Sequence, residues 1–183
     1  MSHFFECGFT INRAIIILGD KMIKFPSKLT DILSQINAQG YEAFFVGGCV
    51  RDAILGIETF DIDINTNAST NVLSELFLDY SPMVYENYGN VKFKLDEYRV
   101  DITRFRKENK KHRYPGSIDF NATLKDDIMR RDFTINGLVY HPDRSIGDLV
   151  DGLNSLKKKE MKTIGNPYLK LDEDYLRMLR LVR

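Results

Sequence analysis

Three observations in the sequence predict an α+β fold, in which a small sheet is backed by helices. Residues 44–65 have the pattern of an apolar strand, a Gly-Gly turn, a short helix and a second strand. Residues 91–105 alternate between apolar and polar side chains, as the strands of a hairpin do. Apolar residues also recur at helical spacing on either side of the central unit, at 29–36 and 72–77.

Length and composition set the limits of the fold. The 183 residues suffice for one domain, or for one domain and part of another. The formal net charge is zero, so any contact with RNA must depend on local basic patches. Cys7 and Cys49 have no metal-ligand spacing and are typical of a reducing cytoplasm. The apolar run at 14–18 is too short to cross a membrane, and residues 1–21 form an extension for which order and disorder are both open.

Two amphipathic helices are expected to supply core residues. The first begins at Ser27 and ends near Gly40, a plausible C-cap, and its buried stripe is Leu29, Ile32, Leu33 and Ile36. Thr70 is the expected N-cap of the second, whose buried stripe is Val72, Leu73, Leu76 and Phe77.

The strand–turn–helix–strand unit carries the first candidate site. Asp61 and Asp63 alternate with apolar residues, so both carboxylates point to one face of the strand. Two such carboxylates repel each other unless a cation such as Mg²⁺ lies between them. The Gly-Gly turn at Gly48 leaves backbone N–H groups free for phosphate at the start of the helix, and Arg51 adds a forked donor. Taken singly, a D-x-D pair is more often a solvated strand face.

The hairpin at 91–105 supplies a third acidic candidate. Its strands, 91–95 and 98–105, meet at Asp96 and Glu97. Asp101 lies on one face of the second strand and is a candidate carboxylate beside Asp61 and Asp63, with or without a metal role. The basic run at 104–113 that follows is expected to be a flexible loop, either simply solvated or in contact with RNA over the site. His112 in this run is expected at the surface.

The last third of the chain is expected to be mainly helical. Residues 123–131 form a capped helix that leads into R-R-D-F-T-I-N, where the arginines could simply complement the helix dipole. A turn at 148–152 and a short helix at 154–159 precede a strand at 161–164. A final helix spans 171–183, with Asp172 or Glu173 in its acidic first turn. Four of its charged residues could form an ordinary ion-paired surface: Asp174, Arg177, Arg180 and Arg183.

Three motifs in this order give the chain a family resemblance over about residues 24–183. G-G-x-V-R-D with D-x-D, then R-R-D-F-T-I-N, then E-D-x-x-R-x-x-R resemble the signatures of class II tRNA nucleotidyltransferases (CCA-adding enzymes) and bacterial poly(A) polymerases. The resemblance implies a nucleotidyltransferase-type head over 22–165, built as a small mixed sheet backed by helices. It also implies that 166–183 starts an all-helical neck.

The resemblance also implies roles for individual residues. Asp61 and Asp63 hold Mg²⁺, and Asp101 completes the catalytic carboxylates. Arg131 contacts the nucleotide together with Gly48 and Arg51, and Asp132 and Asn136 lie near its ribose. The acidic and basic residues of the final helix select the base: Asp174, Arg177, Arg180 and Arg183.

The expected activity is addition of C, A or both from CTP and ATP to the 3′ end of tRNA in the cytoplasm, with release of pyrophosphate. A bacterial poly(A) polymerase shares the same head motifs, and a non-catalytic remnant that binds RNA or a partner protein is the alternative of another class. Because the motifs reach the last residues of the sequence, a second chain or an oligomer is a further expected partner, one that would supply additional helical surface.

Overall fold

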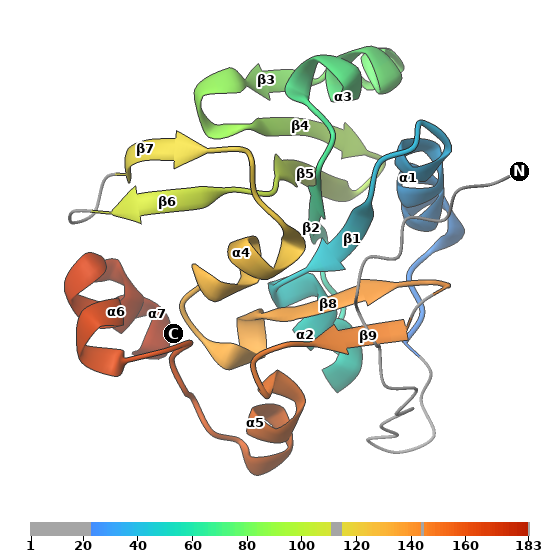
Figure 1. The fold of residues 1–183 in the computed structure, drawn as a ribbon. Coiled ribbons are helices and arrows are strands. Elements are labelled where there is room, and N and C mark those ends of the chain that lie inside the picture. The colour runs from blue at the N-terminus through green and yellow to red at the C-terminus, as the bar shows by residue number, and fades with distance from the viewer. Residues whose placement is uncertain (1–22, 111–114, 144, 183) are drawn as a thin grey trace, which may run out of the picture.

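The computed structural model describes residues 23–110, 115–143 and 145–182 (Figure 1). The expected extension at 1–21, His112 and Arg183 lie outside the described residues. No helix within the described part of the chain is long and apolar enough to cross a membrane.

Seven strands of the described chain form one mixed sheet in the order β3-β4-β5-β2-β1-β8-β9. Only β2 and β5 run parallel; every other neighbouring pair is antiparallel. The strands are β1 (Ala43–Val46), β2 (Asp61–Thr66), β3 (Met83–Tyr85), β4 (Asn90–Leu95), β5 (Tyr98–Arg104), β8 (Leu138–His141) and β9 (Ser145–Asp148). The predicted mixed sheet is therefore confirmed, and so is the 91–105 hairpin, which turns at Asp96 with a positive φ of 53°.

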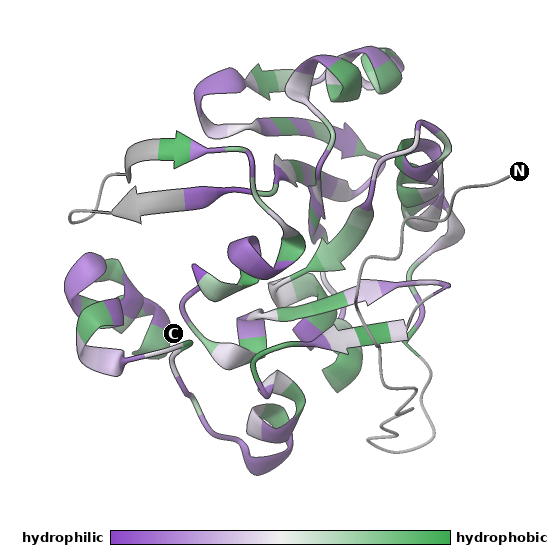
Figure 2. Ribbon diagram, viewed as in Figure 1, coloured by the Kyte–Doolittle hydropathy of each residue, from purple (hydrophilic) through white to green (hydrophobic). Residues whose placement is uncertain are grey.

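The main core lies on one face of this sheet. It is covered by α1 (Ser27–Ala38), α2 (Gly48–Leu55) and α3 (Thr70–Leu76), whose apolar stripes meet Ile62, Ile64 and Val100 from the strands. The central strand β1 is buried on both faces and is hydrophobic throughout (Figure 2). A smaller core on the other face joins Phe44 and Val46 of β1 to Ile128 of α4 (Leu124–Met129).

Local capping chemistry fixes where the helices begin and end. Gly40 follows α1 with a positive φ of 84°, as the sequence predicts, and Gly56 closes α2 in the left-handed conformation. The expected capped helix at 123 is α4, where Thr123 and Asp126 form a capping box. The N-cap predicted at Thr70 is wrong by one residue, because the Ser69 hydroxyl accepts the N–H of Val72.

Two other predictions about secondary structure are wrong. Part of the predicted loop at 104–113 is β6 (Lys107–Lys110), which pairs with β7 (Pro115–Asp119) in a separate two-stranded sheet. The pairing partner lies beyond the basic run, so charge composition alone gives no sign of it. The strand expected at 161–164 is reduced to one bridge between Phe133 and Thr163, after α5 (Gly152–Lys158).

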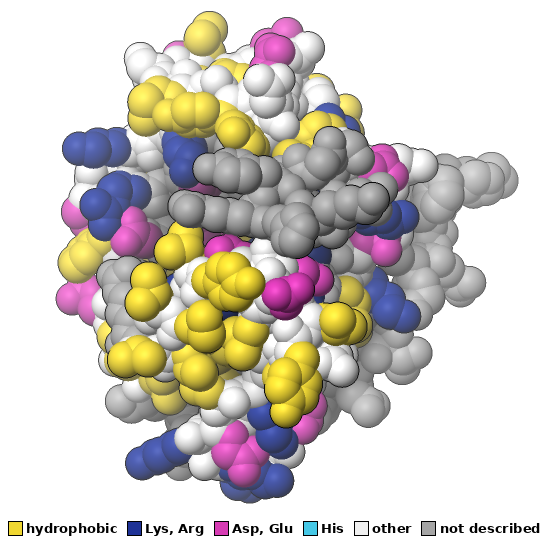
Figure 3. Space-filling view, turned by 90° about the vertical axis from the view of Figure 1, so that its left-hand side faces the viewer, with side chains coloured by type: hydrophobic (Ala, Val, Ile, Leu, Met, Phe, Trp, Pro, Cys, Tyr) yellow, Lys and Arg dark blue, Asp and Glu magenta, His cyan; other side chains and the backbone are white. Residues whose placement is uncertain are grey.

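The single helix predicted at 171–183 is also wrong. The chain forms α6 (Pro167–Glu173), capped by the Asn166 side chain, and then α7 (Leu176–Val182). Asp174 between them is extended, and its carboxylate accepts the N–H of Leu176. Asp174 therefore lies just before α7 and not on its face. Figure 3 looks onto this side of the molecule, where hydrophobic side chains gather, and eight exposed ones belong to these helices and their junction: Tyr168, Leu169, Tyr175, Leu176, Met178, Leu179, Leu181 and Val182.

Close backbone packing at Gly152 gives a stability prediction. A Cβ at this position would lie 2.4 Å from the backbone oxygen of Thr134 and 3.0 Å from Leu138. Gly152→Ala should therefore lower the free energy of unfolding by about 1–3 kcal/mol, as overpacking does. Urea denaturation measures this, with Gly48→Ala as the control, because a Cβ at Gly48 meets only the flexible Arg51 at an ordinary 3.6 Å. Equal stability of the two variants would contradict the packing.

Candidate active site

The sheet face opposite the main core carries the predicted acidic residues in rows across the strands. Parallel pairing of β2 with β5 sets Asp61 beside Arg99 and Asp63 beside Asp101. Paired residues on adjacent strands point to the same face, so the three carboxylates lie together as the sequence predicts. We call this surface, defined by Asp61, Asp63 and Asp101, the carboxylate face.

Cations of the chain already occupy two of these carboxylates. Asp61 accepts both Nε and Nη2 of Arg99, the latter at 2.9 Å, in an exposed bidentate pair. Asp101 lies 2.6 Å from the ammonium of Lys92 and accepts the amide of Asn90 at 2.9 Å. The sequence analysis named neither cation. Arg99 meets Asp61 through the non-local pairing of β2 with β5, whereas Lys92 faces Asp101 across the predicted hairpin, whose register could have shown the pair.

Asp63 is the carboxylate in the least favourable electrostatic position. Although part of its side chain is open to solvent, burial of the carboxyl among neighbouring atoms raises the pKa of Asp63 to about 6. Asp101 and Asp61 raise this pKa further, while Arg131 and Lys92 oppose the change. The ionised form of Asp63 thus lacks enough nearby positive charge.

The candidate carboxylates fit a metal ion whose coordination is completed by water and substrate. Within the described residues, no three His, Cys, Asp or Glu side chains already form a metal cage. Mg²⁺, however, is commonly bound by one or two carboxylates together with water and substrate phosphates. Asp61 and Asp63 offer such a pair of hard oxygen ligands, although Asp61 must first exchange Arg99 for the ion.

The Gly-Gly turn stands directly beside Asp63. Gly47 precedes α2 with a positive φ of 74°, and its N–H donates to the carbonyl of Leu138 at 3.1 Å. A Cβ on Gly47 would lie 2.9 Å from the guanidinium of Arg131 and 3.7 Å from the Asp63 carboxylate. Gly47 is therefore a site residue that the sequence analysis missed in favour of its neighbour, although the repeated glycine is the signal that could have found it.

A buried carboxylate behind the site holds the arginines of the R-R-D-F-T-I-N motif. Asp127 of α4 is fully buried; it pairs with Arg130 at 2.7 Å and with Arg131 at 3.3 Å. It also accepts the amide of Asn65 from β2 in a short hydrogen bond. Asp127 thus ties α4 to the strand that carries the candidate metal ligands, and the guanidinium of Arg131 reaches Gly47.

The same motif meets the first turn of α2. Arg51 donates to the side-chain oxygen of Asn136 at 2.8 Å and pairs with Asp52. Asn136 lies in a short 3₁₀ turn (Thr134–Asn136), and its amide donates to Asp132 at 3.4 Å. Residues 85 positions apart in the chain therefore stand side by side, as the proposed nucleotide contacts require.

The residues expected to select the base are only partly arranged as predicted. Arg180 of α7 lies 3.2 Å from the carboxylate of Asp132 and 3.5 Å from that of Asp174, so α7 meets the R-R-D-F-T-I-N motif. Arg177 instead is almost fully buried against Glu173, at 2.6 Å, and the carbonyl of Lys170. Arg183 lies outside the described residues. The sequence places Asp174 and Arg177 on one helix face; the break before α7 separates them.

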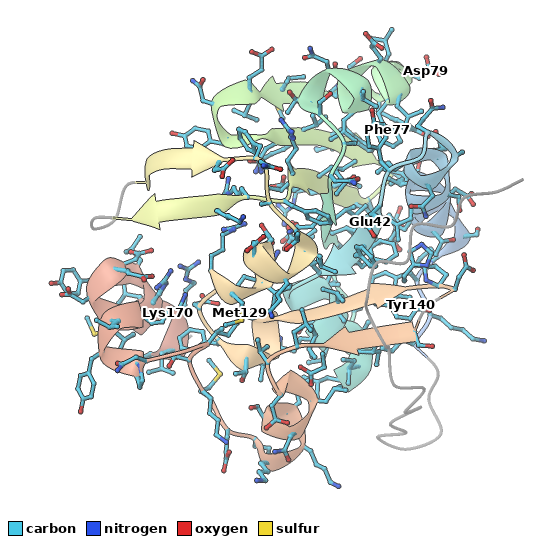
Figure 4. All side chains as sticks on the ribbon, viewed as in Figure 1. Glu42, Phe77, Asp79, Met129, Tyr140 and Lys170 are labelled. Carbon is cyan, nitrogen blue, oxygen red and sulfur yellow. The ribbon has the colours of Figure 1, made fainter. Side chains whose placement is uncertain are left out.

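A second contact joins α6 to the end of α4. The ammonium of Lys170 on α6 donates to the carbonyl of Met129 at the end of α4, at 3.0 Å, and the two labelled side chains lie near each other in Figure 4. Because Met129 immediately precedes Arg130 and Arg131, α6 rests on the segment that positions the arginines.

A comparison with known protein families identifies the family of the region that carries the candidate site. The poly(A) polymerase head domain family matches residues 43–162 of the chain. The chain belongs to this family. The resemblance predicted from the three motifs is confirmed, and with it the nucleotidyltransferase type of head.

Relatives of this poly(A) polymerase head include named CCA-adding enzymes. That of Enterococcus faecalis is 36% identical over 168 residues, which are 89% of this chain and 41% of the relative. That of Oceanobacillus iheyensis is 40% identical over 158 residues, or 85% and 39%. The solved structure of the Bacillus stearothermophilus CCA-adding enzyme in complex with CTP gives a TM-score of 0.73 at 30% identity, covering 85% and 38%. The chain thus spans about two fifths of the length of the curated relatives it matches.

The buried charge of Asp127 gives a prediction about stability. In Asp127→Asn, Arg130 and Arg131 lose the carboxylate that compensates them, so the free energy of unfolding should fall by about 3 kcal/mol. Denaturation measures the loss, and Asp143→Asn is the control, because that carboxylate is almost fully exposed. An Asp127→Asn protein as stable as the control would show that the pairing contributes nothing to the fold.

Proposed function

We propose that this chain is the catalytic head of a tRNA nucleotidyltransferase that adds C, A or both to the tRNA 3′ end from CTP and ATP. The observation that carries the proposal is the meeting of Asp63, Gly47 and Arg131 within one site. There a metal-binding carboxylate, a helix start and a guanidinium converge, and a nucleoside triphosphate needs all three. The CTP, ATP analogue and tRNA named with solved relatives support the choice of substrates.

The chain's own residues would bind and align the substrates. Asp61 and Asp63 would hold Mg²⁺, which when bound supplies charge neutralisation for attack of the RNA 3′-hydroxyl on the α-phosphate and for departure of pyrophosphate. Free N–H groups at the start of α2, at Gly48, face phosphate oxygens, and Arg51 and Arg131 add guanidinium donors. Catalysis is then positioning and electrostatics, with no covalent enzyme intermediate.

Lys92 and Asn90 give Asp101 a supporting role in this proposal. Because both of its oxygens already have partners, Asp101 is poised to adjust the charge beside Asp63 and to accept the metal only by exchanging Lys92. We assign it to the catalytic carboxylates as a neighbour of the metal ligands.

Base choice is assigned to the junction between α6 and α7. Asp174 would accept the exocyclic amine of cytosine or adenine, and Arg177, Arg180 and Arg183 would donate to ring acceptors. Arg177 must first leave Glu173, whereas Arg180 already stands beside Asp174. Asp132 and Asn136, next to Arg180 and Arg51, are assigned to the ribose.

The remaining assignments follow from the same reaction. The enzyme would act in the cytoplasm with Mg²⁺, and a second chain or an oligomer could cover the apolar side of α6 and α7. A bacterial poly(A) polymerase remains the second candidate, because the family description names that activity. Incubation of a tRNA lacking its last nucleotides with CTP and ATP, offered singly, separates the two by the length and composition of the product.

The metal assignment is tested by Asp63→Asn. Loss of one ligand charge should reduce Mg²⁺-dependent nucleotide transfer by at least about 100-fold, since each metal contact stabilises transition-state charge by several kcal/mol. The measurement is single-turnover transfer from CTP to tRNA in a form of the protein that is active when unmodified. Asp79→Asn, at an exposed carboxylate in a distant 3₁₀ turn, is the matched control. Near-normal transfer by Asp63→Asn would refute the assignment.

Base selection is tested at Asp174 with two variants that separate its roles. Serine also caps helices, so Asp174→Ser should keep α7 capped, but its shorter and uncharged hydroxyl is a weaker acceptor for the exocyclic amine than the carboxylate. UTP should then compete with CTP about 10-fold better in both Asp174→Ser and Asp174→Ala, by analogy with base-edge contacts. If only Asp174→Ala changes nucleotide preference in competition assays, Asp174 acts through the helix cap alone.

A further inference from the structure

The carboxylate face continues past the three acidic residues to the free edge of the sheet. The strand registers extend the row of Asp63 through Asp101 to Lys92 and then to Met83 on β3. The adjacent row runs from Asn65 through Thr103 and Asn90 to Tyr85. Residues paired in this way share a face, so Met83 and Tyr85 face the same side as the candidate metal ligands.

This edge exposes apolar and aromatic side chains. Met83 and Tyr85 are 58% and 43% exposed, and the Tyr85 hydroxyl lies 4.0 Å from the sulfur of Met83. Tyr88, in the 3₁₀ turn that follows β3, is also exposed. The main core lies on the opposite face, where Tyr80 stacks on Phe93 at 5.1 Å, so Met83 and Tyr85 do not contribute to it.

Positive charge accompanies these rings. The ammonium of Lys92 lies 5.9 Å from the centroid of Tyr85 and 2.6 Å from Asp101, and so bridges the aromatic edge and the carboxylates. Arg106 donates to the carbonyl of Tyr88 at 2.8 Å. Exposed aromatic rings interleaved with Lys and Arg are how proteins bind single-stranded nucleic acid, with bases stacked on rings and phosphates near cations. An acidic or apolar protein partner would not require both.

The edge also lies at a suitable distance from the reaction. Three strand spacings separate β3 from β2, or about 14 Å at roughly 4.8 Å each. A short stretch of extended single strand spans this length, so an RNA whose 3′-hydroxyl lies at Asp63 can place the base of its penultimate nucleotide over Tyr85. The base-selecting residues belong instead to α6 and α7, elements outside this sheet, which leaves the β3 edge free for the second substrate.

We infer that Met83, Tyr85 and Lys92 form a subsite for the last bases of the RNA strand that is to be extended. The inference rests on the proposed function for the position of the 3′-hydroxyl. In the subsite the penultimate base stacks on Tyr85 against Met83, and Lys92 stands beside the phosphate that joins this base's nucleotide to the terminal one.

The first experiment uses the absence of tryptophan from the sequence. Tyr85→Trp introduces a single indole at the proposed stacking position, and Tyr80→Trp introduces one near the same edge but on the core face. A short RNA oligonucleotide that ends in two cytidines should quench the fluorescence of Tyr85→Trp saturably and leave that of Tyr80→Trp unchanged. CTP alone should quench neither variant. Equal quenching in both variants, or none in Tyr85→Trp, would overturn the subsite.

The second experiment measures affinity. Anisotropy of the same RNA, labelled at its 5′ end, should show binding weakened at least about 5-fold by Tyr85→Ala and changed less than about twofold by Tyr85→Phe, because stacking needs the ring and not the hydroxyl. CTP binding should stay unchanged in both variants. RNA affinity unaltered by Tyr85→Ala, or an unmodified chain without RNA affinity, would overturn the subsite.

The two proposals fail in different ways. RNA binding that depends on Tyr85 in a protein that transfers no nucleotide would refute the transferase and leave an RNA-binding edge. Normal transfer by Tyr85→Ala with an unchanged KM for RNA would refute the subsite and leave the transferase.

Discussion

The site depends on the neutralisation of one buried charge. Asp127 has no contact with solvent, and an isolated carboxylate there would be costly, so the fold surrounds it with Arg130, Arg131 and the amide of Asn65. These partners come from the end of α4 and from β2. Satisfying Asp127 therefore fixes α4 against the strand of the acidic pair, and brings the guanidinium of Arg131 to Gly47.

A second constraint is the absence of side-chain volume at Gly47. The Arg131 guanidinium fills the space in which a Cβ would stand, and the positive φ lets the chain turn from β1 into α2 beside Asp63. The buried charge and the glycine thus act on the same arginine from two sides. With Arg99 and Lys92 on the neighbouring carboxylates, the face balances part of its negative charge with its own cations.

Local sequence patterns predicted much of this arrangement. The alternation around Asp61 and Asp63 predicted their common face, and the sequence at 123–131 predicted a capped helix, in which the structure shows a capping box. The predictions that are wrong concern features determined by contacts between residues distant in sequence, or by a side chain that competes with the local helical pattern. The pairing of β6 with β7 depends on residues beyond the basic run, and the break at Asp174 depends on a carboxylate that caps α7 and interrupts a helical pattern. The sequence places Asp127 only within a capped helix, because its burial follows from how α4 packs on β2.

The single parallel pair of strands has a consequence for how such a protein can change over time. Between β2 and β5 the chain leaves the centre of the sheet, builds α3, β3 and β4, and returns beside the strand that it left. The alignment of Asp63 with Asp101 is fixed by β2 and β5, the two strands between which this excursion of α3, β3 and β4 lies. Within the sheet, β3 at the outer edge of the excursion pairs only with β4. Insertions, deletions and substitutions along that outer margin can accumulate without moving the acidic residues. The excursion is thus a part of the fold in which a lineage can change what the β3 edge binds while the acidic residues keep their positions.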